Sequence, residues 1–142
     1  MASDSEIHGI LQRARAIAVV GMSAQPERPS HAVARFLQRN DYQIIPVNPY
    51  LAAPVLGVAP VASLRDIHTH VDIVAIFRRA ELVDTAVDDA IAIGANAIWM
   101  PLGVVNTAAA ARARAAGLDV IMDRCLAIEH RRLNRYAELA LA

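Results

Sequence analysis

Short, continuously apolar runs alternate along the chain with stretches in which apolar residues recur at helical spacing. The runs are typical of strands buried on both faces of a parallel sheet, and they span 17–21, 43–47, 71–77, 95–100 and 118–122. Helical spacing predicts helices over about 4–14, 30–39, 63–67, 81–93 and 125–139. A further helix, rich in alanine, is expected between Asn106 as its cap and Gly117 as its end. Ser3 with Glu6 fits a capping box at the start of the first helix. The last helix is expected to turn Leu126, Leu133 and Leu139 inward. A weaker strand is expected near 55–58, within a proline-rich segment.

This alternation predicts one fold class. Strands that alternate with helices form a parallel sheet covered on both faces, because each crossover returns the chain to the same edge of the sheet. We therefore expect a single α/β domain over residues 1–142. Its expected architecture is a Rossmann-like, doubly wound parallel sheet of five to six strands with helices on both faces.

Composition agrees with a globular protein and limits its partners. Apolar residues make up 56% of the chain and charged residues 20%, and the net charge is zero. Because no block of basic residues is present, nucleic acid is not an expected partner. All 14 basic residues are arginine, so any side-chain cation that meets a phosphate must be arginine. The single cysteine excludes an internal disulfide and permits a reducing compartment.

The sequence does not predict export or membrane insertion. Residues 1–10 lack the basic-then-apolar order of a signal peptide. Residues 90–111 carry no formal charge over about the length of a membrane span, but Gly94, Pro101 and Gly103 interrupt them. We therefore expect a cytoplasmic protein with no membrane partner. The sequence leaves open whether it forms homo-oligomers or binds another protein.

The loops that follow the strands contain residue types suited to a ligand. In a doubly wound sheet, ligands bind beyond the carboxyl ends of the strands. The loops that fall there are GMSAQPERPS (21–30), NPY (48–50), FRR (77–79), MPLGV (100–104) and DRC (123–125). Gly21 permits a phosphate or sugar to approach the backbone, Ser23 can donate a hydrogen bond, and the start of the next helix favours an anion. The alternative is that Gly21 only turns the chain and Ser30 only caps the helix.

The end of the second strand argues against NAD as the ligand. An NAD-binding domain usually has G-x-G-x-x-G and an acidic residue here that binds the ribose hydroxyls, whereas this chain has Asn48 and Pro49. Asn48 would not repel a phosphate on that ribose, so NADP stays open. Arg78 and Arg79 suit phosphate, or they pair with nearby acidic side chains such as Glu81.

Other residues on these loops also have two interpretations. Trp99 fits the core or an apolar wall of a site, and Cys125 fits a small buried residue or a reactive thiol. Asp123 is expected to cap the last helix, and Glu129-His130 is interpreted as helix surface rather than as a catalytic dyad. No pair of histidines has zinc-binding spacing, and no G-x-S-x-G or Walker motif is present. The sequence thus predicts a pocket without catalytic residues or a metal.

Five motifs in this order resemble a known family: VVGMS…RPSHAVARFL, IIPVNP, FRR, IWMPLGVVN and VIMDRCLAIEH. Over about residues 7–133 the chain resembles the stand-alone bacterial CoA-binding domain proteins. These are similar to the CoA-binding N-terminal domain of the succinyl-CoA synthetase α-subunit. The synthetase also needs a phosphorylated histidine on a second domain and a second subunit, for which 142 residues leave no room. Acyl-CoA synthesis by this chain alone is therefore not expected.

The resemblance implies that coenzyme A or an acyl-CoA binds at the carboxyl edge of the sheet. The first loop would hold the phosphates, and Asn48 and Pro49 would lie against the adenosine. The residues expected to bind the cofactor are Gly21, Met22, Ser23, Arg28, Ser30, Asn48, Pro49, Phe77, Arg78, Arg79, Leu102 and Gly103. Two positions depart from the family's pattern: Tyr50 replaces a frequent basic residue, and Pro101 replaces a common glutamine.

The sequence therefore favours a small protein that binds CoA or an acyl-CoA without catalysis of its own. One alternative is an enzyme that uses Cys125 with bound CoA for thiol-redox or acyl-transfer chemistry. Another is an NADP-binding module.

Overall fold

The computed structural model describes the backbone of residues 2–141 and the side chains of residues 2–135. Within these residues the chain forms one sheet of five parallel strands in the order β2-β1-β3-β4-β5. The strands are β1 (Ala16–Val20), β2 (Gln43–Val47), β3 (Ile73–Ile76), β4 (Ala97–Trp99) and β5 (Asp119–Ile121). The α-helices are α1 (Asp4–Arg13), α2 (Pro29–Arg39), α3 (Val83–Ala92), α4 (Thr107–Ala115) and α5 (Leu126–Leu141). Short 3₁₀ turns at Leu64–Asp66 and Ala80–Leu82 complete the order. The predicted Rossmann-like α/β fold is confirmed.

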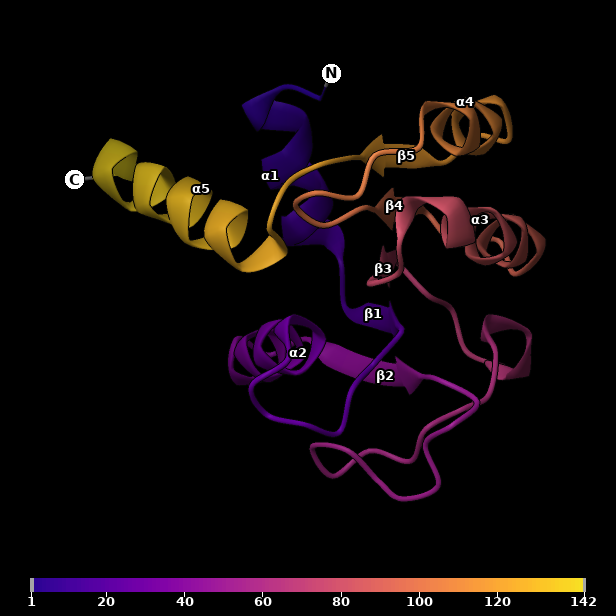
Figure 1. Ribbon diagram of the computed structural model, residues 1–142. Coiled ribbons are helices and arrows are strands. Elements are labelled where there is room, and N and C mark those ends of the chain that lie inside the picture. Colours follow the sequence, from indigo (N-terminus) through magenta and orange to yellow (C-terminus); the bar gives the residue numbers. More distant parts are fainter. Residues whose placement is uncertain (1, 142) are drawn as a thin grey trace.

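The sheet separates two helical layers (Figure 1). Helices α3 and α4 pack on one face and share a core with Val20, Val74 and Ile98. Helices α1, α2 and α5 pack on the other, around Ile17 and Trp99. All residues of β1, β3 and β4 are buried, as strands covered on both faces must be.

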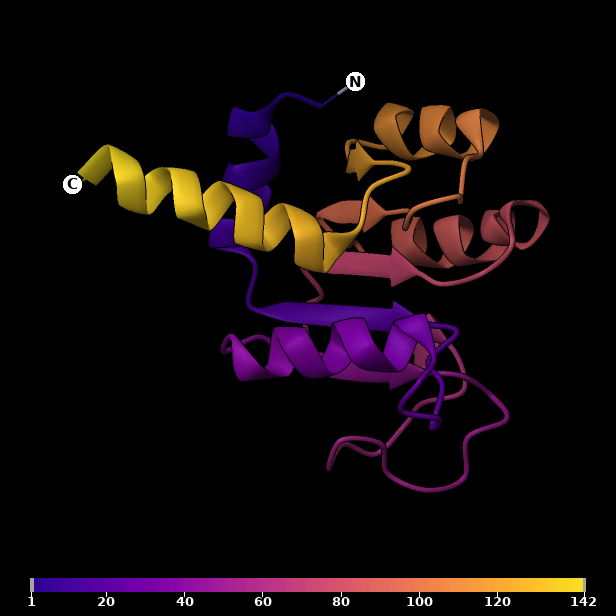
Figure 2. The ribbon, with the colours of Figure 1, turned by 60° about the vertical axis from the view of Figure 1, so that its left-hand side comes forward.

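Strand order reverses at β1. The chain passes from β1 to β2 on one side and then returns to pair β3 with β1 on the other. Strands β1, β2 and β3 point the same way in Figure 2, so their following loops gather at one edge. A reversal of this kind opens a crevice at the carboxyl ends of the strands, where ligands bind in such sheets.

The weak strand predicted near 55–58 is wrong. Val55 and Val58 form only an isolated antiparallel bridge, closed by two backbone hydrogen bonds of 3.0 Å. Leu56 and Gly57 between them have φ angles of +53° and +77°, which make a tight turn. Pro54 and Pro60, which lack a backbone N–H, flank this turn. Since neither proline can donate to a strand ladder, the segment remains a loop beyond β2 (Figure 2).

Local side-chain caps form as the sequence predicts. The Ser3 side chain accepts a hydrogen bond from the Glu6 N–H at 3.2 Å, and Asn106 accepts one from the Ala109 N–H at 3.0 Å. Leu126 and Leu133 on α5 are buried as expected, whereas the side chain of Leu139 lies outside the described residues. Among the described helices, none is both long and apolar enough to cross a membrane.

The surface interpretation of Glu129 and His130 is wrong, because both side chains are buried. Glu129 accepts hydrogen bonds from Arg124 and Arg132, which compensate its charge. The His130 ring lies edge-on to the rings of Phe36 and Tyr42, with centroids 5.4 and 5.6 Å away. Helix α5 contacts both α1 and α2, so the side of α5 expected to face water is covered.

Candidate functional site

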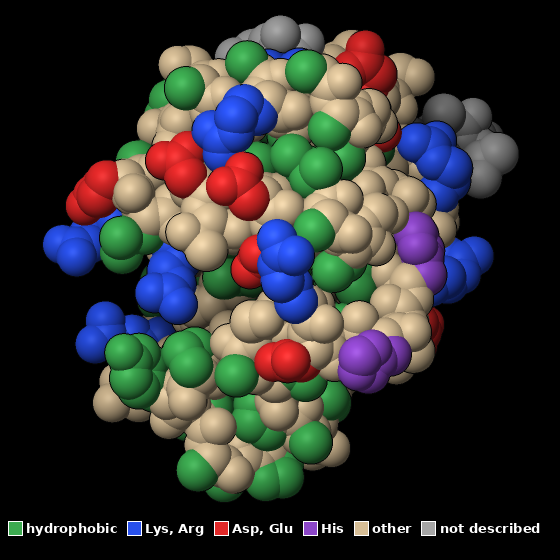
Figure 3. Space-filling model, turned by 90° about the vertical axis from the view of Figure 1, so that its right-hand side faces the viewer, with side chains coloured by type: hydrophobic (Ala, Val, Ile, Leu, Met, Phe, Trp, Pro, Cys, Tyr) green, Lys and Arg blue, Asp and Glu red, His purple; other side chains and the backbone are tan. Residues whose placement is uncertain are grey.

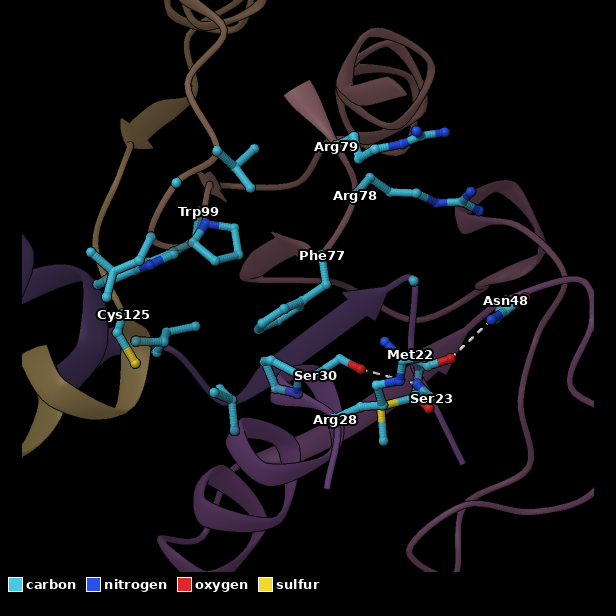
Figure 4. A pocket seen from close by; sticks show the side chains of 18 of the residues that line it. Met22, Ser23, Arg28, Ser30, Asn48, Phe77, Arg78, Arg79, Trp99 and Cys125 are labelled. Atoms are coloured by element: carbon cyan, nitrogen blue, oxygen red, sulfur yellow. Dashed lines mark hydrogen bonds between the residues drawn. The ribbon is translucent and has the colours of Figure 1, made fainter. Parts of the chain in front are cut away.

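A cavity of about 960 Å³ opens at the carboxyl edge of the sheet. Its walls come from the five loops that follow the strands and from the N-terminal parts of α2 and α5 (Figure 4). From the first half of the chain it is lined by Gly21, Met22, Ser23, Ala24, Gln25, Arg28, Pro29, Ser30, Val33, Asn48 and Leu51. From the second half it is lined by Phe77, Arg78, Arg79, Trp99, Pro101, Leu102, Gly103, Val104, Cys125 and Leu126. Eleven of the twelve residues expected to bind the cofactor line it; Pro49 does not.

The β1–α2 loop is held by its own hydrogen bonds. Ser30 is buried in the first turn of α2, and its Oγ accepts a hydrogen bond from the Ser23 N–H at 3.1 Å. Ser23 Oγ in turn accepts one from the Gln25 N–H at 3.1 Å. The N-cap position belongs to Arg28, whose side chain makes no capping bond. The alternative, that Ser30 only caps the helix, is therefore wrong: Ser30 fixes the loop, and the start of α2 lines the cavity.

Asn48 connects the β2 loop to the β1 loop (Figure 4). Its side-chain N–H donates to the Met22 carbonyl at 2.9 Å, and its side-chain oxygen accepts from the Tyr50 N–H at 2.9 Å. Both ends of the amide are thus used inside the protein. Asn48 contributes to the cavity wall by ordering two loops at once.

Pro49 lines a second, smaller cavity of about 280 Å³. This cavity lies between the end of β2, the Leu64–Asp66 turn and α3, and its walls include Val47, Ser63 and Leu64. Arg78 lines both cavities, so they adjoin along this side chain. Tyr50, which follows Pro49, is 90% exposed.

Cations from two loops border the main cavity, and none of its lining residues is acidic. Arg28 donates from Nε to the Gln25 side chain at 3.3 Å. Arg79 lies 3.5 Å from Glu81 and is 80% exposed, which fits the alternative of a helix-start ion pair. Arg78 makes no hydrogen bond or ion pair with any described residue. Arg78 is half-buried, and of the three arginines that line the cavity it has the most guanidinium N–H donors available to an anion.

Several charges on the side of the molecule formed by α3 and α4 are paired. On the face shown in Figure 3, arginine side chains in the upper and central part lie next to acidic ones. Arg112 pairs with Asp84 and Asp88 at 2.9 and 3.0 Å, and Arg65 pairs with Asp89 at 2.7 Å. The main cavity differs from these sites, because Arg28, Arg78 and Arg79 line it without an acidic lining residue beside them.

The opposite wall of the cavity is apolar and firmly held. Trp99 is 1% exposed, so the core interpretation is confirmed, yet one side of the residue also lines the cavity. Its indole N–H donates to the Arg124 carbonyl at 2.7 Å. Asp123 accepts a hydrogen bond from the Gly103 N–H at 2.8 Å. The side chain expected to cap α5 instead joins the β4 and β5 loops.

Sequence reasoning missed part of this wall. Val33 and Leu126 line the cavity, but both read as ordinary apolar positions of helices. Nothing in their local sequence distinguishes them from residues that face only the core. Cys125 beside Leu126 is half-buried and free. Across the described residues, no three His, Cys, Asp or Glu side chains cluster as metal ligands would.

Comparison with known proteins gives consistent matches. A family model described as a CoA binding domain matches residues 15–131. The uncharacterized protein YneT of Bacillus subtilis (strain 168) is 41% identical over 128 residues, which cover 90% of this chain and 94% of YneT. The structure of cell-free ID.343 from Thermus thermophilus has a TM-score of 0.89 and 34% identity, and the match covers 93% of this chain and 99% of that one. A hypothetical protein from Pyrococcus horikoshii OT3 has a TM-score of 0.89 and 36% identity over 93% of this chain and 92% of its own.

Proposed function

The chain belongs to the family of CoA-binding domains, and from this premise we propose that its cavity binds coenzyme A or an acyl-CoA, without catalysis by the chain itself. The observation that carries the proposal is the arrangement of Arg28 and Arg78 on two loops at the switch point, with no acidic residue in the cavity lining. An Arg guanidinium offers several N–H donors in a geometry that matches phosphate oxygens.

The β1–α2 loop is suited to the pyrophosphate. Gly21, with φ of +80°, turns the chain into this loop and lets it pack against the Phe77 carbonyl, which fills the space where a Cβ would lie. The first turn of α2 contains no acidic residue. The positive end of the helix dipole is therefore not neutralised by a side chain there and can attract an anion. Arg28 stands at the N-cap position and adds a charge. Together these groups form an anion site made mostly of backbone.

The second cavity is suited to the adenosine end. Pro49 offers an apolar surface there, and Arg78 borders both cavities. CoA has a phosphate on its ribose, which a carboxylate after β2 would repel; this chain has Asn48 instead, turned toward Met22. Because Tyr50 is not basic and is exposed, we assign the contact with the ribose phosphate to Arg78.

Two alternatives make different predictions. NADP also carries a ribose phosphate, so it competes with CoA if the site recognises only that group. An enzyme that uses Cys125 is favoured only by the position of Cys125 in the cavity wall. If the Cys125→Ser protein retained all thiol-redox or acyl-transfer turnover, this alternative would be excluded.

The whole of residues 1–142 is proposed as one CoA-binding unit, supported by the Arg132–Asp4 ion pair of 2.8 Å that joins α5 to α1.

The test is titration calorimetry on protein freed of bound ligand, with CoA, acetyl-CoA, NADP and NAD. We expect micromolar binding of the CoA compounds and no heat from the nicotinamide cofactors. Arg28→Ala should weaken CoA binding and reduce its salt dependence, because one phosphate contact is lost. Arg114→Ala, an exposed arginine on α4, is the matched control. Failure of CoA to bind would refute the proposal.

A further inference from the structure

The main cavity has two chemically different ends. In Figure 4, Arg78, Arg79 and Asn48 lie on one side of Phe77, and Trp99 and Cys125 lie on the other. The lining residues around the second end are Val33, Trp99, Pro101, Leu102, Cys125 and Leu126. None of them carries a formal charge. A ligand that spans the cavity therefore needs an anionic end and an apolar end.

The polar groups of the apolar end are already used. The indole N–H of Trp99 donates to the Arg124 carbonyl at 2.7 Å, so Trp99 offers only carbon to the cavity. The Arg124 guanidinium donates to Glu129 at 3.2 Å, and the Gly103 N–H donates to Asp123 at 2.8 Å. Pro101 has no backbone N–H. This wall has few groups that could solvate a charged ligand, and the apolar side chain that it exposes most, Leu102 at 60%, gains from meeting an apolar one.

The wall is also preformed. Trp99 and Leu126 are 1% and 2% exposed, and each is anchored in the core between the sheet and α5. Because this apolar wall is fixed, a ligand that enters requires little reorganisation of the protein. The volume of about 960 Å³ is near the upper end of the roughly 300–1,000 Å³ typical of ligand sites. This volume has to hold the pantetheine arm of a CoA as well as the phosphates, so the acyl chain takes the part of the apolar end that lies beyond the thioester sulfur.

We infer that the end of the cavity bounded by Val33, Trp99 and Leu126 holds the uncharged, apolar acyl chain of a CoA thioester, so that the protein prefers such acyl-CoAs to free CoA. This inference rests on the proposed function, because it requires the CoA moiety to occupy the arginine end. Acyl groups that end in a carboxylate are disfavoured, since no cation lines the apolar end.

The experiment is a series of calorimetric titrations with CoA and with acetyl-, butyryl-, hexanoyl-, octanoyl- and succinyl-CoA. Each methylene that enters an apolar site is expected to raise affinity by about fourfold, until the chain fills the end of the cavity. Butyryl-CoA, with two more methylenes, should therefore bind roughly 15-fold more tightly than acetyl-CoA. Succinyl-CoA, with the same number of acyl carbons as butyryl-CoA, should bind more weakly than butyryl-CoA.

The outcomes separate the two proposals. If CoA binds and the series is flat, or if succinyl-CoA equals butyryl-CoA, the acyl site is refuted while CoA binding stands. If no member of the series binds, the proposed function itself fails, and the acyl site fails with it.

A narrowed cavity gives an independent check. Cys125→Leu adds apolar volume at a half-buried position of this wall, and Cys125→Ser preserves the volume. We expect Cys125→Leu to reduce the ratio of hexanoyl-CoA affinity to CoA affinity by at least about tenfold, and Cys125→Ser to leave the ratio near that of the wild type. An unchanged ratio in a folded Cys125→Leu protein would contradict the inference; the ligand series on the wild type decides the matter if that variant does not fold.

Discussion

Gly21 lies so close to the backbone of Phe77 that a Cβ on Gly21 would overlap the Phe77 carbonyl oxygen. The two residues follow neighbouring strands, and the Phe77 N–H donates to the Val20 carbonyl at 2.9 Å. This contact brings the β1–α2 loop and the Phe77–Arg79 loop together at the switch point. The glycine is thus required by a neighbour far along the chain as well as by its own φ of +80°.

Gly21→Ala should destabilise the protein and abolish ligand binding. A positive φ costs a non-glycine residue about 1–3 kcal/mol, and the overlap with Phe77 adds about 1–3 kcal/mol of strain. Gly57→Ala is the control, because Gly57 has a similar φ of +77° but open space where the alanine methyl group would lie. Urea unfolding should show a clearly larger loss for Gly21→Ala; equal losses would mean that the Phe77 contact is unimportant.

Arg78 and Arg79 are adjacent but should differ in their effect on binding. Arg78 lines both cavities, whereas Arg79 is 80% exposed and pairs with Glu81. A charge-assisted hydrogen bond contributes about 1.5–3 kcal/mol, so Arg78→Ala should weaken CoA binding about 10- to 100-fold. Arg79→Ala should weaken it less than about threefold, because an exposed cation is screened. Calorimetry at two salt concentrations measures both, and a reversed order would place the phosphate at Arg79.

Ser30→Ala should loosen the β1–α2 loop. The substitution removes the acceptor of the Ser23 N–H, and an unsatisfied, partly buried donor costs about 1–3 kcal/mol. We expect a lower free energy of unfolding together with weaker CoA binding. Ser23→Ala removes only an exposed bond to the Gln25 N–H, so it should affect binding with little loss of stability. If Ser30→Ala unfolds like the wild type in urea, its hydrogen bond does not hold the loop.

Glu129→Gln should destabilise the packing of α5. Glu129 is 6% exposed and accepts hydrogen bonds from Arg124 and Arg132, so removal of its charge leaves two guanidinium groups less compensated. Because both arginines reach water, we expect a loss on the order of 2 kcal/mol rather than the larger cost of a fully buried pair. Asp4→Asn breaks only the exposed arm of this network and should cost clearly less in the same urea measurement.

Acidification should destabilise the protein through His130. Burial, aided by the charges of Arg131 and His8, lowers the pKa of His130 below its usual value of 6.5. As the pH falls, the unfolded chain therefore takes up this proton before the folded protein does. The contribution to stability is complete above about pH 6.5 and is lost as the pH falls through the lowered pKa. Unfolding free energies between about pH 5 and pH 8 should depend less on pH in His130→Gln, whereas the control His68→Gln, at a more exposed position away from α5, should follow the wild type.

Local and topological rules account for what the sequence could predict. The apolar runs located the strands, and Ser3 and Asn106 marked helix starts, because both depend on neighbours within a few residues. The parallel order then placed five loops at one edge. The prediction of a strand at 55–58 was wrong because Pro54 and Pro60 lack the backbone N–H donors that a strand ladder needs.

The arrangement of the site depends on contacts between residues that are far apart in the sequence. From the sequence, Pro49 and Asn48 form one adenosine surface; in the structure Asn48 turns to Met22 and Pro49 faces a second cavity. Glu129 and His130 read as surface until α1 and α2 cover α5. Val33 and Leu126 carry no local signal that they border a cavity.

The sequence by itself determined the fold class, the edge at which a ligand would bind and the residue types available there, because periodicity and crossover handedness act along the chain. Only the tertiary structure decided which loops share a cavity. It also decided that Arg78 borders both cavities and that the end of the main cavity away from Arg78 is apolar. Those properties arise from contacts between residues far apart in sequence, such as Gly21 with Phe77 and Trp99 with Arg124. No local pattern encodes such contacts.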